Sequence, residues 1–206
     1  MHKTGEKAAW EQIRGLGGEV SRMTGIAFEA GAFKFRSLGM DFFIRPGDET
    51  IEAADQGGGA FLSRFSYFFN HLALWWLVYS KGIPLAGRLV RPEGLPGGGA
   101  FFRGSHTLPL EGLAGRYGSD GEGFIERAKA LGATGPDGQG GKAKAGPADY
   151  SAVLAPAPGL PVHILLWLRD EEFPARAEVL FSSSTGVILP LDVIWCAAML
   201  CLLPML

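Results

Sequence analysis

The sequence predicts an α+β protein in which antiparallel strands, in two groups, pack on a buried aromatic helix and a C-terminal helix. Apolar and polar residues alternate along Ala32–Leu38, which is the period of half-buried strands, and a three-stranded meander is predicted from about Phe33 to Ala53. A second group of strand-like runs lies between Tyr150 and Phe181. Two long apolar stretches, Phe61–Ser80 and Leu191–Leu203, have the composition of buried helices. Strands in separate groups, packed with helices of this kind, define the α+β class.

The composition bounds the class of protein further. A chain of 206 residues is long enough for one substantial core, so we expect a single domain over residues 1–206. Hydrophobic residues make up 47% of the chain and charged residues 19%, an apolar excess that must be buried in a core, in a partner or in lipid. The net charge of −2 comes from scattered acids and bases. Nucleic acid is therefore excluded as a partner, because its recognition requires a basic patch.

The first quarter of the chain predicts two short helices followed by a three-stranded meander. The helices are Glu6–Arg14, which ends at a run of glycines, and Val20–Met23. A tight reversal is expected at residues 45–48, Arg-Pro-Gly-Asp, because proline fixes one φ and glycine permits the other. The expected strands are Ala32–Leu38, Met40–Ile44 and Thr50–Ala53.

The strongest helix is predicted over Phe61–Ser80. We expect Gln56–Gly59 to form a loop before it and Lys81-Gly82 to cap its C-terminus, where a cation and a left-handed glycine both fit. Its second half is apolar nearly all round, which predicts burial on most sides. Its apolar residues at three- and four-residue spacings are Phe61, Phe65, Phe68, Phe69, Leu72, Trp75, Trp76 and Tyr79.

The middle of the chain is rich in glycine and proline and predicts short elements. Short strands are expected at Gly87–Val90 and Ala100–Phe102, and helices at Leu110–Tyr117 and Gly121–Leu131. Residues 133–148 are of low complexity and predict a flexible surface loop. The later strands, two of them on either side of a Pro-Ala-Pro-Gly turn, are expected at Tyr150–Ala155, Val162–Leu168 and Ala177–Phe181.

The C-terminal stretch bears on localisation. Cys196 and Cys201 are five residues apart, which on a helix directs them to different faces and away from a mutual disulfide. Two buried thiols, and an N-terminus without a secretory signal, predict the cytoplasm. Pro190 and Asp192 leave only Val193–Leu206 uninterrupted, which is short of the roughly 20 residues of a membrane span. We expect a buried helix there, or one that docks a protein partner or a second copy of the chain.

The segment between the second and third of the later strands carries three consecutive carboxylates, Asp170, Glu171 and Glu172, followed by Phe173 and Pro174. Adjacent carboxylates raise one another's pKa, so they suit acid–base catalysis or the binding of a hard cation. The same residues also suit a charged turn that keeps a sheet edge soluble. Both interpretations stay open, and with them the question whether the protein is an enzyme.

A second candidate site is His71 on the aromatic helix. Trp75 and Phe68 lie near it at helical spacing. A histidine among aromatic rings suits an axial ligand to a planar cofactor of the haem type. It equally suits a hydrogen-bonded core residue, and the sequence leaves both interpretations open.

Weaker candidates lie in the glycine-rich region. Gly98, within Gly97–Gly99, would let a phosphate approach the backbone amides. Arg103 and His106 could contact an anion in the loop that follows. No Walker sequence follows the glycines, and no cysteine spacing predicts a metal site.

Several of these segments occur in an order that resembles a known family, the domain of unknown function numbered 3786, from about Ala32 onward. The resemblance implies a protein of anaerobic bacteria or archaea and implies no activity. Two features depart from the family: Ser182 stands where the pattern has aspartate after Leu-Phe, and a cysteine-rich iron–sulfur module is lacking. The carrying residues are Leu72–Leu77, Gly82–Gly87, Leu95–Gly98, Phe124–Gly132, Asp170–Pro174, Leu180-Phe181 and Leu189-Pro190.

Together these observations predict an accessory protein that binds a small molecule or a cofactor, such as a tetrapyrrole, next to its aromatic helix. The alternatives are an enzyme that uses the acidic segment at residues 170–172 and a non-catalytic subunit of a larger complex. The ligand itself is not predicted.

Overall fold

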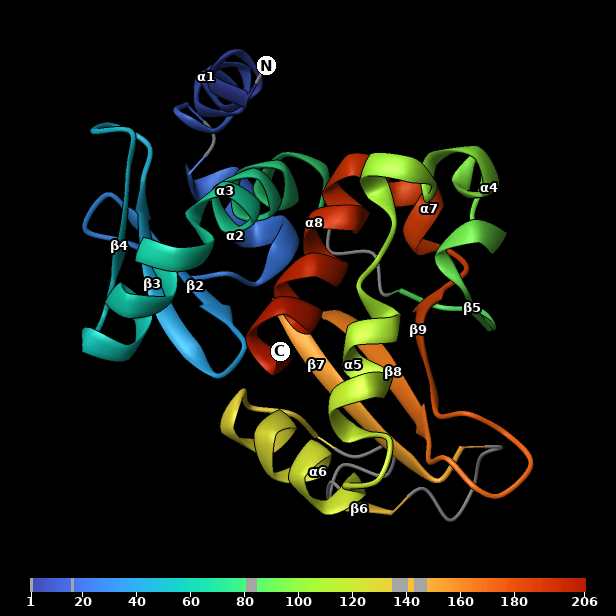
Figure 1. The fold of residues 1–206 in the computed structure, drawn as a ribbon. Helices are drawn as coiled ribbons and strands as arrows, with labels where there is room; N and C mark the ends of the chain where they lie inside the picture. Colours follow the sequence, from blue (N-terminus) through green and yellow to red (C-terminus); the bar gives the residue numbers. More distant parts are fainter. Residues whose placement is uncertain (1, 16, 81–84, 135–140, 143–147) are drawn as a thin grey trace.

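The computed structural model describes residues 2–15, 17–80, 85–134, 141–142 and 148–206. It confirms the α+β class: antiparallel strands form two separate sheets, and helices pack against them (Figure 1). The sequence had left open whether the strand groups form one sheet or two. Two helices precede the first sheet, α1 (His2–Ile13) and α2 (Gly17–Thr24), and both are longer than predicted.

The first sheet is the predicted meander with one short strand added. Its order is β1-β2-β3-β4, with β2 and β3 in register at Phe35 and Phe42. The reversal between them has Leu38 at φ 49° and Gly39 at φ 79°, the two positive values that a tight hairpin needs. The strands are β1 (Phe28–Glu29), β2 (Ala32–Ser37), β3 (Met40–Arg45) and β4 (Thr50–Ala53).

Helix α3 (Gln56–Tyr79) begins earlier than the sequence predicted. The expected loop at Gln56–Gly59 is wrong, because Asp55 caps the helix and its Oδ1 accepts a hydrogen bond from the Gly58 amide at 2.8 Å. The glycine also has a packing role, since a Cβ at Gly58 would lie 2.9 Å from Ala53 Cβ. At the other end the cap residue is Ser80; the predicted cap, Lys81-Gly82, lies outside the described residues.

The second sheet has the order β5-β9-β8-β7-β6, all antiparallel. The hairpin of β7 and β8 turns at the predicted proline-rich segment, with Gly159 at φ 76°. Most of the loop expected at residues 133–148 lies outside the described residues, although Thr134 and β6 pair with β7. The strands are β5 (Leu89–Val90), β6 (Gly141–Lys142), β7 (Tyr150–Ala157), β8 (Leu160–Trp167) and β9 (Arg176–Ser182).

Three helices cover one face of the second sheet: α5 (Leu110–Tyr117), α6 (Gly121–Ala130) and α8 (Leu191–Leu202) (Figure 1). The residues beneath them alternate along the strands, and Leu166, Ile164 and Val179 are fully or almost fully buried. The prediction of helices at 110–117, 121–131 and 191–203 is confirmed to within one residue.

The segment between β5 and α5 is built from short helical turns. The predicted strand Ala100–Phe102 is wrong, because left-handed Gly97 (φ 77°) starts a helix there and Gly98 packs closely against Pro92. A Cβ at Gly98 would lie 2.0 Å from the Pro92 carbonyl oxygen. The remaining short elements are η1 (Pro92–Gly94), α4 (Gly98–Phe101), η2 (Gly104–His106), α7 (Thr185–Ile188) and η3 (Leu203–Met205).

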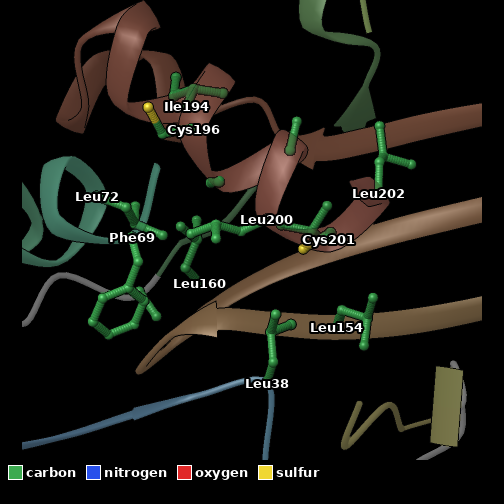
Figure 2. Packing of buried hydrophobic residues seen from close by; sticks show 14 of the residues in the cluster. Leu38, Phe69, Leu72, Leu154, Leu160, Ile194, Cys196, Leu200, Cys201 and Leu202 are labelled. Atoms are coloured by element: carbon green, nitrogen blue, oxygen red, sulfur yellow. The ribbon is translucent and has the colours of Figure 1, made fainter. Parts of the chain in front are cut away.

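The core lies where α8 meets α3 and the second sheet. Leu200 of α8 points towards Leu72 of α3 and Leu160 of β8, with Phe69 beside them (Figure 2). Cys196 and Cys201 are free and buried, and burial raises the pKa of both thiols. The C-terminal helix therefore packs inside the protein. In the part of the chain that the structure describes, no helix has the length and apolar character needed to cross a membrane.

Candidate functional site

The structure joins His71 to a carboxylate far away in the sequence. Nε2 of His71 on α3 lies 3.0 Å from Oδ2 of Asp192, in the first turn of α8. The hydrogen bond with His71 lowers the pKa of Asp192, against the opposing effect of partial burial. An ionised carboxylate only accepts hydrogen bonds, so Nε2 carries the proton. The imidazole is 9% exposed and the carboxylate 54%, so the pair reaches the surface through Asp192.

Partly exposed aromatic rings extend on both sides of this pair. Along α3, Trp75 stacks on Tyr79 with 5.4 Å between ring centroids, and His71 lies 6.4 Å from Trp75. On the other side, Trp195 of α8 contacts Phe68 at 5.4 Å. These residues belong to a set that we call the aromatic band: Phe68, His71, Trp75, Tyr79, Phe101, His106 and Trp195.

His106 joins the same band from a different segment. Its ring stacks on Phe101 at 4.2 Å and meets the edge of Trp195 at 5.0 Å. The structure therefore brings together three of the residues that the sequence singled out, namely His71, Trp75 and His106. Arg103 is exposed, three residues before His106.

Gly98 occupies a different kind of environment. It is buried in α4, and its amide donates a hydrogen bond to the Leu95 carbonyl at 2.8 Å. The close approach to Pro92 accounts for the glycine. A phosphate on this amide would have to displace a hydrogen bond of the fold.

The acidic segment forms an ordered turn between β8 and β9. Oδ1 of Asp170 accepts hydrogen bonds from the amides of Glu172 at 2.8 Å and Phe173 at 2.7 Å, and the Asp170 amide donates to the Phe173 carbonyl. Asp170 thus holds the turn, while Glu171 and Glu172 are exposed. Phe173 stands out from the turn with 66% of its surface exposed.

The serines at and just after the end of β9 hydrogen-bond to the backbone of Ala86. The hydroxyl of Ser182, which stands where the family pattern has aspartate, donates to the Ala86 carbonyl, and Ser184 accepts from the Ala86 amide. Among the described residues, no three histidine, cysteine or acidic side chains are grouped so that they could hold a metal ion.

The comparisons agree with the resemblance noted in the sequence. The model of the family Domain of unknown function (DUF3786) matches residues 18–202, and the chain belongs to this family. No curated protein and no solved structure matches the chain.

The sequence did not single out three residues of this region as site residues: Asp192, Trp195 and Phe101. A signal for Asp192 was present, because it is the only charged side chain from Gly186 onward, and a lone carboxylate in a buried helix needs a partner. The partner could not be identified, since His71 lies 121 residues earlier.

Proposed function

We propose that the protein is a non-enzymatic accessory protein that binds a planar small molecule on the aromatic band. The observation that carries the proposal is the convergence of partly exposed rings from α3, α8 and the α4–η2 segment around the His71–Asp192 pair. Flat ring systems bind between aromatic side chains through dispersion and stacking.

The chemistry of the pair favours a ligand of a particular kind. The Asp192 carboxylate has a lowered pKa and is half exposed, so it offers an acceptor to a hydrogen-bond donor or a positive charge. Stacked rings also favour cationic edges over anionic ones. We therefore expect a planar, mostly apolar molecule with a donor or cationic group at one edge.

The core of the aromatic helix is not where this ligand would bind. Phe61 packs on Phe65 and Phe69, and both Phe61 and Phe69 pack on Phe42 of the first sheet, with ring centroids 4.3–6.1 Å apart. These rings fill the space between α3 and the sheet. A ligand would instead lie against the face of α3 that carries Phe68, Trp75 and Tyr79.

The enzyme alternative has less support. The Asp170 carboxylate accepts two backbone hydrogen bonds at Oδ1, so one of its two oxygens is committed to holding the turn. Glu171 and Glu172 are exposed to solvent, where a carboxylate has no special reactivity.

Native mass spectrometry and an absorption spectrum of the protein, purified without oxygen from its own host, test the proposal. A stoichiometric added mass with a visible or near-ultraviolet band is expected. The purified chain should then bind a planar probe, a porphyrin or a flavin, with quenching of tryptophan fluorescence. A bare, colourless chain that leaves both probes unbound contradicts the proposal.

Variants locate the site. Trp195→Leu and Asp192→Asn should each weaken probe binding about tenfold, since one good aromatic or charged contact contributes about 1.4 kcal/mol. Trp167→Leu is the matched control, because it removes a partly buried tryptophan on the opposite face of the second sheet. An equal loss in the control would show that binding does not occur at the aromatic band.

A further inference from the structure

The face of the second sheet that points away from the helices carries a strip of apolar residues among polar ones. Pairing between the strands fixes its membership: Leu165 lies opposite Ser151 and Glu178, and His163 opposite Val153 and Leu180. We call this set the outer face: Leu89, Ser151, Val153, His163, Leu165, Trp167, Arg176, Glu178 and Leu180.

The outer face is separate from the core. Val153, Leu165 and Leu180 are only partly buried and, among the described residues, are not packed against the buried hydrophobic cluster. Helices α5, α6 and α8 all lie on the other face. An antiparallel sheet with one face in water normally carries polar residues on that face. On this face β8 instead carries Leu165 and Trp167, with His163 as its polar residue.

At the C-terminal end of β8, charged residues lie on both sides of the strand. The Arg176 guanidinium lies 3.9 Å from the centre of the Trp167 ring, on the β9 side of β8. On the β7 side of the same strand end, the Asp149 carboxylate accepts a hydrogen bond from the Leu168 amide at 2.8 Å. A cation and an anion thus lie on opposite sides of β8.

We propose that the outer face packs against the outer face of a second copy of this chain, around a two-fold axis parallel to β8. That axis exchanges the β7 and β9 sides, so Arg176 of one protomer faces Asp149 of its partner. Leu165 lies over Leu165, and Leu180 over Val153. Arg176 and Asp149 complement each other under this operation, while Glu178 stays paired with Arg91 and Arg176 of its own chain. This complementarity is why we favour a second copy over an unrelated partner.

The outer face is large enough for a dimer interface if the residues at both ends of the sheet are included. A standard interface buries about 800 Å² on each partner, more than three short strands supply. Leu89 on β5 is 45% exposed at one end and Phe173 is 66% exposed in the turn beyond the other. Leu89 extends the apolar surface along the sheet, and Phe173 is a further exposed apolar residue in the adjoining turn.

Sedimentation or light scattering of the purified full chain over a range of concentrations tests the dimer. The expected mass is twice the 22.0 kDa of the chain. Leu165→Lys and Leu180→Lys should each halve that mass while circular dichroism stays that of a folded protein. Val187→Lys is the matched control, because Val187 is a single apolar residue with 80% exposure on α7, and it should leave the dimer intact.

Charge reversal tests the orientation. Arg176→Asp and Asp149→Arg should each raise the dimer dissociation constant about tenfold, and the double variant should recover most of the loss. A chain that is monomeric at all concentrations, or a dimer that survives both lysine variants, overturns the proposal. A dimer that lysine dissociates but the double charge variant does not rescue overturns the two-fold arrangement.

Discussion

The two sheets share antiparallel pairing and one buried face, but their other faces differ in chemistry. The outer face of the first sheet carries charged residues in ion pairs, with Arg36 3.1 Å and Lys34 3.8 Å from Asp41 carboxylate oxygens and Arg45 3.4 Å from Glu52. The outer face of the second sheet also has an ion-paired carboxylate, Glu178, which lies 3.8 Å from Arg176 and contacts Arg91. Around it lie the apolar residues Leu165, Leu180 and Trp167.

The residue composition of a sheet face depends on whether water or another layer of protein covers it. Surface ion pairs contribute little to stability but keep a sheet face soluble. Apolar side chains on a face that the core does not use are costly to expose. We therefore expect a further layer on the second sheet rather than on the first.

The largest effect should come from the buried face of the first sheet. Phe42→Ala removes a ring that packs 4.3 Å from Phe69, and we expect it to lower the free energy of unfolding by about 3–5 kcal/mol. Leu165→Ala on the outer face of the second sheet should cost no more than about 1 kcal/mol at concentrations where the chain is monomeric. Urea denaturation measures both. Equal losses would mean that Leu165 belongs to the core of one chain.

A smaller effect is expected in the turn that joins β8 and β9. Asp170→Ala removes the acceptor of two backbone hydrogen bonds, and should cost about 1 kcal/mol in urea denaturation. Glu171→Ala is the control and should change stability by less than about 0.5 kcal/mol, because its side chain is exposed. A loss of stability in the control instead would place the structural carboxylate at Glu171.

The smallest effect should be a pH dependence that the first sheet lacks, since its strands contain no histidine. Burial lowers the pKa of His163 on the outer face of the second sheet. Below the ordinary pKa of about 6.5 the unfolded chain therefore binds the proton more readily than the folded chain. The stability that neutral His163 contributes is fully present above its ordinary pKa of about 6.5. It is lost as the pH falls from there through the lower pKa of His163 in the folded chain.

Denaturation of the wild type and His163→Leu between about pH 5 and 7.5 measures this contribution. The difference in unfolding free energy between the two proteins should change across that range, while other histidines cancel. In a dimer, burial of His163 would be greater, so the dimer should dissociate more readily at the acidic end. A difference that does not depend on pH would contradict the lowered pKa.

Much of the fold could be predicted from local patterns. The meander from Phe33 to Ala53 and helices α5, α6 and α8 depend on alternation and helical spacing, which act over a few residues. The wrong predictions arose at glycines. The runs at Gly57–Gly59 and Gly97–Gly99 are typical of loops, yet both form first turns of helices, because Asp55 caps one and Pro92 packs closely against the other.

The candidate site could be predicted only in part. His71, Trp75 and His106 were recognised from residue type, and the structure places all three in the aromatic band. Their convergence depends on α8, which brings Asp192 and Trp195 to α3. Residue type indicates the chemistry of which a side chain is capable, and only the packing of the helices shows which residues lie beside it.

By itself the sequence determined the α+β class, the alternating faces of the strands and the burial of the aromatic helix, because side-chain periodicity and turn chemistry are local properties. Tertiary structure alone decided which strand face the helices cover and which carboxylate pairs with His71. Those outcomes depend on contacts between segments far apart in the sequence, 121 residues for His71 and Asp192, where local preference carries no information and complementary packing selects the partner.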